Sequence, residues 1–192
     1  MMKSEIRILG FDDGPFEKED KTVPVVGVVY RGGKFLDGIL KTEVKVDGLD
    51  STKKIVKLIN SSRHKQQLKV IMFDGITFGG FNIFDVKEIY EKTKLPVIII
   101  NRKHPNLEDV KNALKNFKDF KRRWKIILRA GKIKECKIKE NRKVYYQCIG
   151  LEDEETEEII KLSSTHSYIP EPLRVAHLIA TGIVKGESGG RA

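Results

Sequence analysis

The sequence predicts an α/β fold in which helices flank a mixed sheet. Three strand-like runs come first, in EIRILGFDD and in the two halves of VPVVGVVYRGGKFLDGILKTEVKV, which join at Gly32 and Gly33. Closely spaced runs of this kind are typical of an antiparallel meander. Helical and strand-like segments then alternate from residue 50 to residue 120. Because strands joined by crossover helices run parallel, we expect a three-strand antiparallel meander followed by parallel strands.

The segment DSTKKIVKLINSS is expected to form the first helix, since Ile55, Leu58 and Ile59 recur at helical spacing. Asp50 or Ser51 is placed to cap its first turn. The short apolar run LKVIMFD follows as a strand that ends on Asp74, before the glycine-rich stretch GITFGGFN.

The second half of the chain continues with further helices and strands. We expect IFDVKEIYEKTK to be a helix, LPVIIIN a fully buried strand, and HPNLEDVKNALKNF a helix capped by Asn106. Residues 120–150 are expected to form one or more strands, with a hairpin turn near Glu140 and Asn141. Two helices complete the chain, LEDEETEEIIKLSS with acids in its first turn and PEPLRVAHLIATGIVKG with Pro172 near its start.

The composition predicts one domain over residues 1–192, since 192 residues with 40% hydrophobic content suffice for a single core. No stretch approaches the roughly 20 apolar residues of a membrane span, and the charged start MMKSEIRILG does not resemble a secretory signal. We therefore expect a cytoplasmic protein with no membrane partner. Cys136 and Cys148 both fall in strand-like runs, which favours two reduced core thiols over a disulfide.

The charge balance favours a polyanionic partner such as nucleic acid, DNA or RNA. Lys and Arg number 37 against 27 Asp and Glu, for a net charge of +10. A chain rich in Lys and Glu also fits the composition of a thermophile, whose Lys surplus is solvated surface. The two interpretations are compatible, and the sequence does not choose between them.

Aspartates end two strands that this topology makes neighbours. Asp12 and Asp13 end the first strand and Asp74 ends the VIMFD strand. Because the carboxyl ends of parallel strands meet at one edge of a sheet, these carboxylates are expected to lie close enough to share an ion. Oxygen ligands of this kind suit Mg²⁺ or Mn²⁺ and the hydrolysis of a phosphodiester. The alternative is that Asp and Gly simply form turns at both places.

Three more residues are candidates for the same edge. Arg102 and Lys103 follow the buried LPVIIIN strand directly and are expected to hold a phosphate. His177 lies on the last helix, where a lone His on an apolar face is more often a structural residue than a ligand.

The basic stretch KDFKRRWKIILR suits phosphate contact and base stacking. A solvated helix end has the same composition, and we favour that second interpretation slightly.

Four stretches resemble, in order and spacing, the signature blocks of endonuclease V-type proteins. They are GFDDG, VIMFDG, LPVIIINRK and CIGLEDEETEEIIKLSSTHSYIPEPLRVAHLIA. The resemblance covers nearly the whole chain and is closest to an uncharacterised archaeal branch of that superfamily, a family of unknown function. It implies the ribonuclease H-like fold and a Mg²⁺-dependent endonuclease that cleaves DNA or RNA near a deaminated base.

The resemblance also implies roles for individual residues. Asp12 and Asp74 match the family's metal-binding aspartates, His177 is similar to a His or Asp in its last helix, and Arg102 falls at or near a family lysine. The family's aromatic wedge and catalytic glutamate have no counterpart in KVDGLDSTKKIVK. Asp47 or Asp50 is our conjectured substitute for the catalytic glutamate. His177 and Asp13 are the further candidate metal ligands beside Asp12 and Asp74.

These observations leave three hypotheses about function. The first is a divalent-metal-dependent nuclease-like protein in which Asp12, Asp74, His177 and Asp50 are catalytic. The second is a nucleic-acid-binding module that retains the fold without hydrolysis, which the missing glutamate motivates. The third is a protein–protein scaffold whose aspartates are structural.

Overall fold

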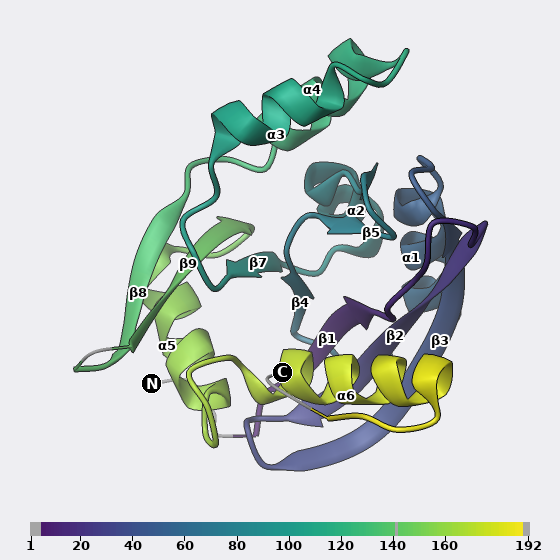
Figure 1. Ribbon diagram of the computed structural model, residues 1–192. Helices are drawn as coiled ribbons and strands as arrows, with labels where there is room; N and C mark the ends of the chain where they lie inside the picture. The colour runs from purple at the N-terminus through teal and green to yellow at the C-terminus, as the bar shows by residue number, and fades with distance from the viewer. Residues whose placement is uncertain (1–4, 141, 190–192) are drawn as a thin grey trace.

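The computed structural model describes residues 5–140 and 142–189. Seven strands of this part form one mixed sheet in the order β3-β2-β1-β4-β7-β9-β8, and two short strands form a separate pair, β5-β6 (Figure 1). The strands are β1 (Arg7–Asp13), β2 (Thr22–Arg31), β3 (Phe35–Lys45), β4 (Val70–Asp74), β5 (Thr77–Phe78), β6 (Asn82–Ile83), β7 (Val97–Asn101), β8 (Lys134–Lys139) and β9 (Arg142–Ile149).

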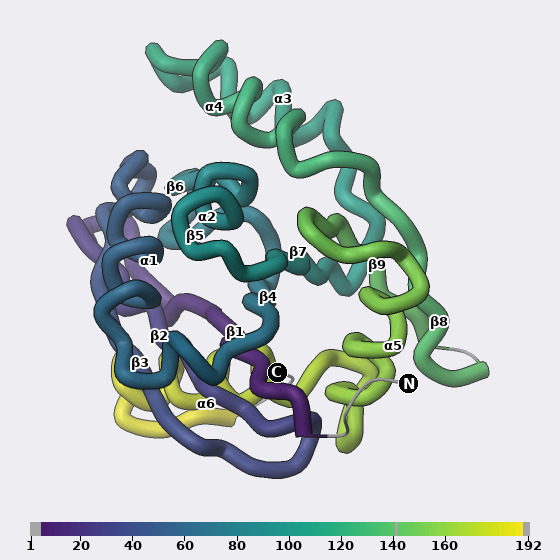
Figure 2. The backbone as a smooth tube through the Cα atoms, turned by 180° about the vertical axis from the view of Figure 1, so that it is seen from behind, coloured from purple at the N-terminus to yellow at the C-terminus, as the bar shows by residue number. Residues whose placement is uncertain are grey.

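The helices of the described part cover both faces of the sheet (Figures 1 and 2). They are α1 (Ser51–Asn60), α2 (Val86–Thr93), α3 (Leu107–Leu114), α4 (Phe120–Leu128), α5 (Asp153–Ser163) and α6 (Glu171–Lys185). One core cluster joins α1 and α2 to one face of the central strands. On the opposite face, α5 packs against β7, β8 and β9, while α6 packs on β1 and β2.

The predicted strand directions are confirmed. The strands β1, β2 and β3 form the antiparallel meander, and β1, β4 and β7 run parallel to one another. The strand β9 then pairs antiparallel with β7, and β8 pairs antiparallel with β9. The β8–β9 hairpin agrees with the predicted turn at Glu140, whereas Asn141 lies outside the described residues.

The prediction of strands over residues 120–150 is wrong for its first part, because residues 120–128 form the helix α4. Phe120, Trp124 and Ile127 recur at helical spacing and pack in a cluster with Leu114 and Ile83. The apolar run at residues 126–128 obscured this period. The short β5–β6 pair within the glycine-rich stretch was also not predicted.

The capping predictions have mixed outcomes. The side chain of Asn106 accepts hydrogen bonds from the amides of Glu108 and Asp109, as expected for the cap of α3. Asp50 occupies the N-cap position of α1 but makes no side-chain capping bond. Its carboxylate instead pairs with Lys54 and accepts a hydrogen bond from Asn82.

Both cysteines are free, as predicted. Burial raises the pKa of the Cys136 thiol to about 11, so this group is an inert part of the core. Within residues 5–140 and 142–189, no helix combines the length and apolar character that crossing a bilayer requires.

Candidate functional site

Asp12 and Asp74 lie side by side at the ends of two parallel strands. Phe11 of β1 is opposite Phe73 of β4, so the next residues along the two strands are Asp12 and Asp74. Side chains alternate between the faces of a sheet. Asp12 and Asp74 therefore point to the face that α6 covers, which is opposite to the face on which Phe11 and Phe73 stack. This placement is the one that the sequence predicts.

Two glycines of the β1 segment allow α6 to lie close against the strand (Figure 1). A Cβ atom on Gly10 would be 2.5 Å from the Cβ of Pro172, and one on Gly14 would be 2.8 Å from a methyl group of Val184. Gly10 and Gly14 share the face of Asp12 because they are two residues away on either side. The helix therefore runs directly over the Asp12 side chain.

His177 meets Asp12 as a consequence of this approach. Five residues of helix from Pro172 span about 7.5 Å, and two residues of strand from Gly10 span about 6.7 Å. The imidazole and the carboxylate thus reach the same level, and His177 Nδ1 lies 2.8 Å from Asp12 Oδ2. The hydrogen bond to Asp12 raises the pKa of His177, which favours the imidazolium form.

Asp74 is half-buried among charges of both signs. Burial, followed by the charge of Asp12, raises the pKa of Asp74 to about 6. The Arg102 guanidinium opposes this shift from the end of β7, with its Nη2 atom 3.4 Å from Asp74 Oδ2. Arg102 therefore projects to the edge that the sequence predicts. Two adjacent carboxylates with one imidazole and one guanidinium beside them form the centre of the candidate site.

Asp13 points to the other face of β1, because neighbouring strand residues alternate. Its Oδ2 atom accepts a hydrogen bond of 2.7 Å from the amide of Gly79, in the loop after β5. Burial raises the pKa of Asp13 to about 7, and the charge of Asp12 adds to the shift while the Gly79 bond opposes it. Asp13 therefore supports the glycine-rich loop, and its predicted role as a metal ligand stays a prediction.

Asp50 is held in a different set of contacts. Its carboxylate accepts hydrogen bonds from Asn82 Nδ2 at 2.7 Å and from the Lys45 amide, and it pairs with Lys54 Nζ at 2.8 Å. These contacts join the end of β3 to α1 and β6. The structure therefore does not bring Asp50 into the Asp12–Asp74 network, and its catalytic role stays a prediction.

Lys103 is exposed at the end of β7, where it follows Arg102. Within the described chain it has no hydrogen-bonded or ion-paired partner. Its predicted phosphate contact therefore also stays a prediction.

A buried arginine connects the loops around the site and was not singled out by the sequence. The guanidinium of Arg123 on α4 donates to the backbone carbonyls of Asp47 (2.8 Å), Gly48 (3.2 Å) and Phe81 (2.6 Å). The amide of Asp47 in turn donates to the carbonyl of Gly79, whose own amide holds Asp13. Arg123 is one of six basic residues in KDFKRRWKIILR, so the residue type alone did not distinguish it from its solvated neighbours.

The residues of the site fit a magnesium ion bound through few protein ligands. Among the described residues, no group of three or more His, Cys, Asp or Glu side chains is arranged to hold an ion. Mg²⁺, however, keeps several water ligands and is usually bound through one or two carboxylates. The Asp12–Asp74 pair supplies two such carboxylates, and the charge of Asp12 contributes to the raised pKa of Asp74, so the two groups repel each other when both are ionised.

The chain is similar to several archaeal proteins along its whole length. A family model described as endonuclease dU matches residues 4–184. A UPF0215 protein of Methanothermobacter thermautotrophicus is 52% identical over 193 residues, which cover 100% of this chain and 94% of the relative. Another UPF0215 protein, from Methanosarcina mazei, is 52% identical over a match that covers 100% of this chain and 97% of that relative.

Solved structures show the same fold. A protein of unknown function from Archaeoglobus fulgidus aligns with a TM-score of 0.86 and 37% identity over 95% of this chain and 100% of that one. The catalytic domain of human endonuclease V aligns with a TM-score of 0.62 and 13% identity over 95% and 83% of the two chains.

Endonuclease V of Ciona intestinalis, in complex with a DNA that contains an inosine followed by a ribo-adenosine, aligns with a TM-score of 0.58. The identity is 13%, over 90% of this chain and 83% of that one. These likenesses show the ribonuclease H-like fold of endonuclease V, and the family match agrees with the resemblance found in the sequence. The chain therefore belongs to the endonuclease dU family.

Proposed function

We propose that the chain is a divalent-metal-dependent nuclease that cleaves phosphodiester bonds in nucleic acid. The observation that carries the proposal is the Asp12–Asp74 pair, a buried and a half-buried carboxylate on neighbouring parallel strands, with His177 in contact with Asp12 and Arg102 in contact with Asp74. The net charge of +10 favours a polyanionic substrate. The DNA in the Ciona endonuclease V complex supports the same class of substrate by analogy of fold.

Each residue has a separate task in this mechanism. Asp12 and Asp74 would hold Mg²⁺ or Mn²⁺, which supplies polarisation of the phosphodiester and a bound water of lowered pKa. Asp12 also fixes the His177 ring through Nδ1, so the other ring nitrogen is free to orient a water or to give a proton to the leaving oxygen. Arg102 would exchange its contact with Asp74 for a phosphate oxygen.

Cleavage assays with purified protein test the proposal. The substrates are labelled single-stranded and double-stranded DNA and RNA, unmodified or with one deoxyuridine or one inosine, in MgCl₂, in MnCl₂ and in a chelator. We expect cleavage only with a divalent ion. Removal of one metal-binding carboxylate in Asp74→Asn costs several kcal/mol of transition-state stabilisation, so the rate should fall at least roughly 100-fold.

The matched control is Glu19→Gln, which makes the same acid-to-amide change at an exposed residue. This variant should cleave at the wild-type rate. If no substrate is cut by the wild type beyond the level of Asp74→Asn, the enzyme proposal is wrong.

A nucleic-acid-binding module without cleavage is the second candidate. It is favoured by the lack of a third carboxylate or imidazole arranged as a metal ligand among the described residues. In that case affinity for nucleic acid would depend on salt through counterion release and would be the same in wild type, in Asp12→Asn and in the presence of chelator.

A further inference from the structure

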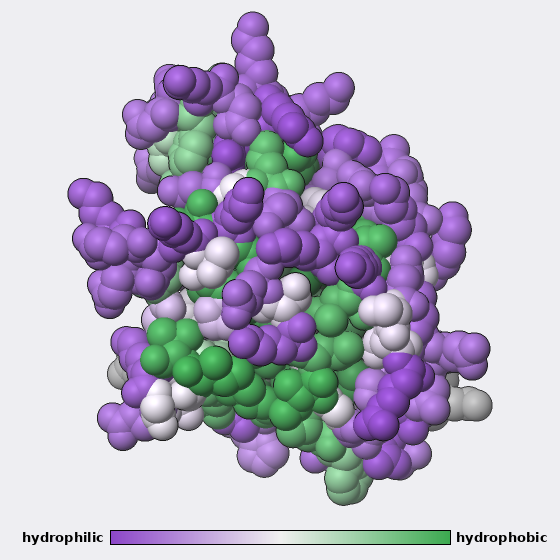
Figure 3. All heavy atoms as spheres, turned by 90° about the vertical axis from the view of Figure 1, so that its right-hand side faces the viewer, coloured by the Kyte–Doolittle hydropathy of each residue, from purple (hydrophilic) through white to green (hydrophobic). Residues whose placement is uncertain are grey.

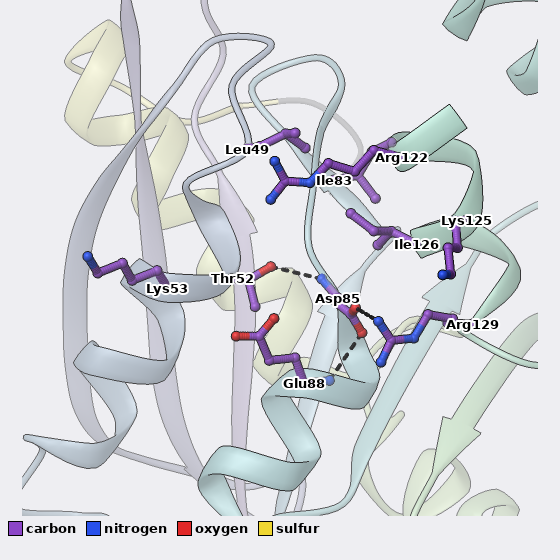
Figure 4. A pocket seen from close by; sticks show the side chains of 10 residues that line it. All are labelled: Leu49, Thr52, Lys53, Ile83, Asp85, Glu88, Arg122, Lys125, Ile126 and Arg129. Atoms are coloured by element: carbon purple, nitrogen blue, oxygen red, sulfur yellow. Dashed lines mark hydrogen bonds and ion pairs between the residues drawn. The ribbon is translucent and has the colours of Figure 1, made fainter. Parts of the chain in front are cut away.

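A cavity of about 420 Å³ lies between α1, the start of α2 and one face of α4 (Figure 4). Its volume is in the range of sites that bind small organic groups. Leu49, Ile83 and Ile126 give it an apolar part, and Thr52, Asp85 and Glu88 give it polar groups. Lys53, Arg122, Lys125 and Arg129 also line it. Neither Asp12 nor Asp74 lines this cavity, so it is separate from the carboxylate site.

The α4 side of the cavity is a row of cations. Arg122, Lys125 and Arg129 follow one another at intervals of three and four residues and therefore lie on one face of the helix end. All three are exposed, and the area at the top of Figure 3, where α3 and α4 lie, is mostly hydrophilic with smaller hydrophobic patches. In Figure 4 these side chains extend from α4 toward the cavity, whereas Lys53 extends to the far side of α1.

Two of these cations are not neutralised by a hydrogen-bonded partner. Arg129 pairs with Asp85 at 2.6 Å, and Glu88 pairs with Lys92 at 2.9 Å, so the two acids of the cavity are engaged. Asp119, which lies near Arg122, is bonded to Arg123 at 2.6 Å. Within residues 5–140 and 142–189, Arg122 and Lys125 have no ion pair. The cavity therefore has a net positive rim beside an apolar wall.

The backbone on which these cations stand is firmly attached. Arg123, between them in sequence, is 5% exposed and donates to three backbone carbonyls of the 47–48 and 81 segments. The guanidinium of Arg123 also lies 4.3 Å from the centre of the Phe117 ring. Because the helix is already fixed, binding a ligand orders no further backbone there, and the ordering cost falls on the side chains of Arg122 and Lys125.

One short segment of chain links the cavity to the neighbour of Asp12. The amide of Gly79 holds Asp13, and Ile83, four residues after Gly79, lines the cavity. Gly79 and Ile83 are therefore at most ~14 Å apart, which is about the axial length of four nucleotides of a duplex strand at ~3.4 Å each.

From these observations we propose that the cavity binds one unpaired nucleotide of the nucleic-acid strand that also passes the carboxylate site. The base lies against Leu49 and Ile126, which are partly exposed, and backbone phosphates contact Arg122 and Lys125. An apolar wall with a cationic rim is complementary to a nucleotide, which has a flat apolar face and an anionic backbone. This inference rests on the proposed function, because it concerns another part of the same substrate.

Binding without cleavage tests the site. The probes are fluorescein-labelled 12-nucleotide single strands of DNA and of RNA, with anisotropy measured in a chelator over a range of salt. The double variant R122Q/K125Q should bind at least tenfold more weakly than wild type. The slope of log affinity against log salt should become shallower by about 1.4, because two single-strand phosphate contacts are lost.

The control is K137Q/K139Q, which removes two exposed lysines of β8 that lie outside the cavity. It has the same net charge as R122Q/K125Q and should keep its affinity within twofold of wild type. Equal losses in the two double variants, or no loss in R122Q/K125Q, would overturn the inference while leaving the proposed function intact. If the wild type binds neither strand at low salt, the proposed function is overturned as well.

A second measurement locates the base. A 12-nucleotide strand with 4-thiothymidine at one position is cross-linked by light, and the attached peptides are identified by mass spectrometry. We expect attachment within residues 49–53, 83–88 or 122–129. Attachment only elsewhere would contradict the inference. So would tighter binding of free adenosine 5′-monophosphate than of the strands, since the ligand would then be a free nucleotide.

Discussion

The carboxyl group of Asp13 makes folding sensitive to pH. Its pKa is about 7 in the folded state against an ordinary value of 3.8, because it is buried next to Asp12 and Asp74. The folded chain therefore binds more protons than the unfolded chain between these two values. The stability that depends on Asp13 is fully present below about pH 4 and is lost as the pH rises through 7. The difference corresponds to about 4 kcal/mol.

Asp13→Asn should remove this dependence. The amide oxygen still accepts the bond from the Gly79 amide, but it carries no charge at any pH. We expect the variant to be more stable than wild type by about 2–4 kcal/mol at pH 8.5 and to be close to wild type at about pH 3.5, where the Asp13 carboxyl is largely protonated in the folded and the unfolded chain alike. Urea unfolding in a chelator at both pH values measures the difference in the free energy of unfolding between the variant and wild type. Glu19→Gln is the control, and parallel pH profiles for Asp13→Asn and wild type would contradict the expectation.

At the level of single residues, the sequence predicts the place of a side chain best when the geometry of a strand determines which residues lie beside it. Asp12, Asp74 and Arg102 each end or directly follow a strand, and topology alone places them at one edge. Arg123 contacts carbonyls up to 76 residues away in the sequence. No local pattern encodes such contacts, so its role appears only in the folded structure.

At the level of elements, the contact between β1 and α6 depends on glycine. Gly10→Ala places a methyl group 2.5 Å from the Pro172 side chain and 2.6 Å from its backbone carbonyl carbon, so the helix must move away from the strand. We expect a loss of about 1–3 kcal/mol in the free energy of unfolding, as for other overpacked sites. Urea unfolding at pH 7 is the measurement.

The same substitution within α6 is the matched control. Gly182 lies within the helix, and no atom of the surrounding structure lies within 4 Å of the point that an alanine Cβ would occupy there. Gly182→Ala should therefore stabilise the protein by roughly 0.5–1 kcal/mol, because alanine is the better helix former. If Gly10→Ala and Gly182→Ala changed the free energy of unfolding equally, Gly10 would not be needed for the close packing of α6 on β1.

Helices and strands were predictable where the apolar residues follow a single spacing, helical or strand-like, along the sequence. The helix α1 follows from Ile55 and Ile59, which are both fully buried, and β7 follows from its continuous apolar run. The helix α4 was misread because three consecutive apolar residues hid its period. The β5–β6 pair has two residues in each strand, which is too short for any periodicity to show.

At the level of the whole molecule, binding of a divalent ion should stabilise the fold. An ion that binds the folded state alone adds about 1.4 kcal/mol at ten times its dissociation constant, which for a chain of this size corresponds to roughly 3–6 °C in Tm. We expect MgCl₂ to raise the Tm of wild type by this amount relative to chelator. The double variant Asp12→Asn/Asp74→Asn should show no rise.

The thermal measurement also separates the scaffold hypothesis from a metal-binding role of the aspartates. A purely structural role for the aspartates predicts that Asp12→Asn lowers the Tm and that magnesium shifts neither protein. An equal magnesium shift in wild type and in the double variant would place the ion elsewhere. The outcome does not require a substrate, so it is independent of the cleavage assays.

The neighbouring position of β1 and β4 was predictable because it is one of the few arrangements that satisfy the rules for connections. The places of β7, β9 and β8 in the order β3-β2-β1-β4-β7-β9-β8 appear only in the structure. The position of α6 did not follow from such rules. Its distance from β1 depends on Gly10, Gly14 and Pro172 together, and only the folded chain shows that they meet.

The pairing of Asp12 with His177 joins residues that are 165 positions apart in the chain. A ribosome adds about 5–20 residues per second, so the aspartate is synthesised roughly 8–33 s before its partner. Throughout this interval the growing polypeptide carries the carboxylates without the imidazole. The catalytic candidates can therefore assemble only after α6 has been synthesised, and a product released before α6 would lack one of them.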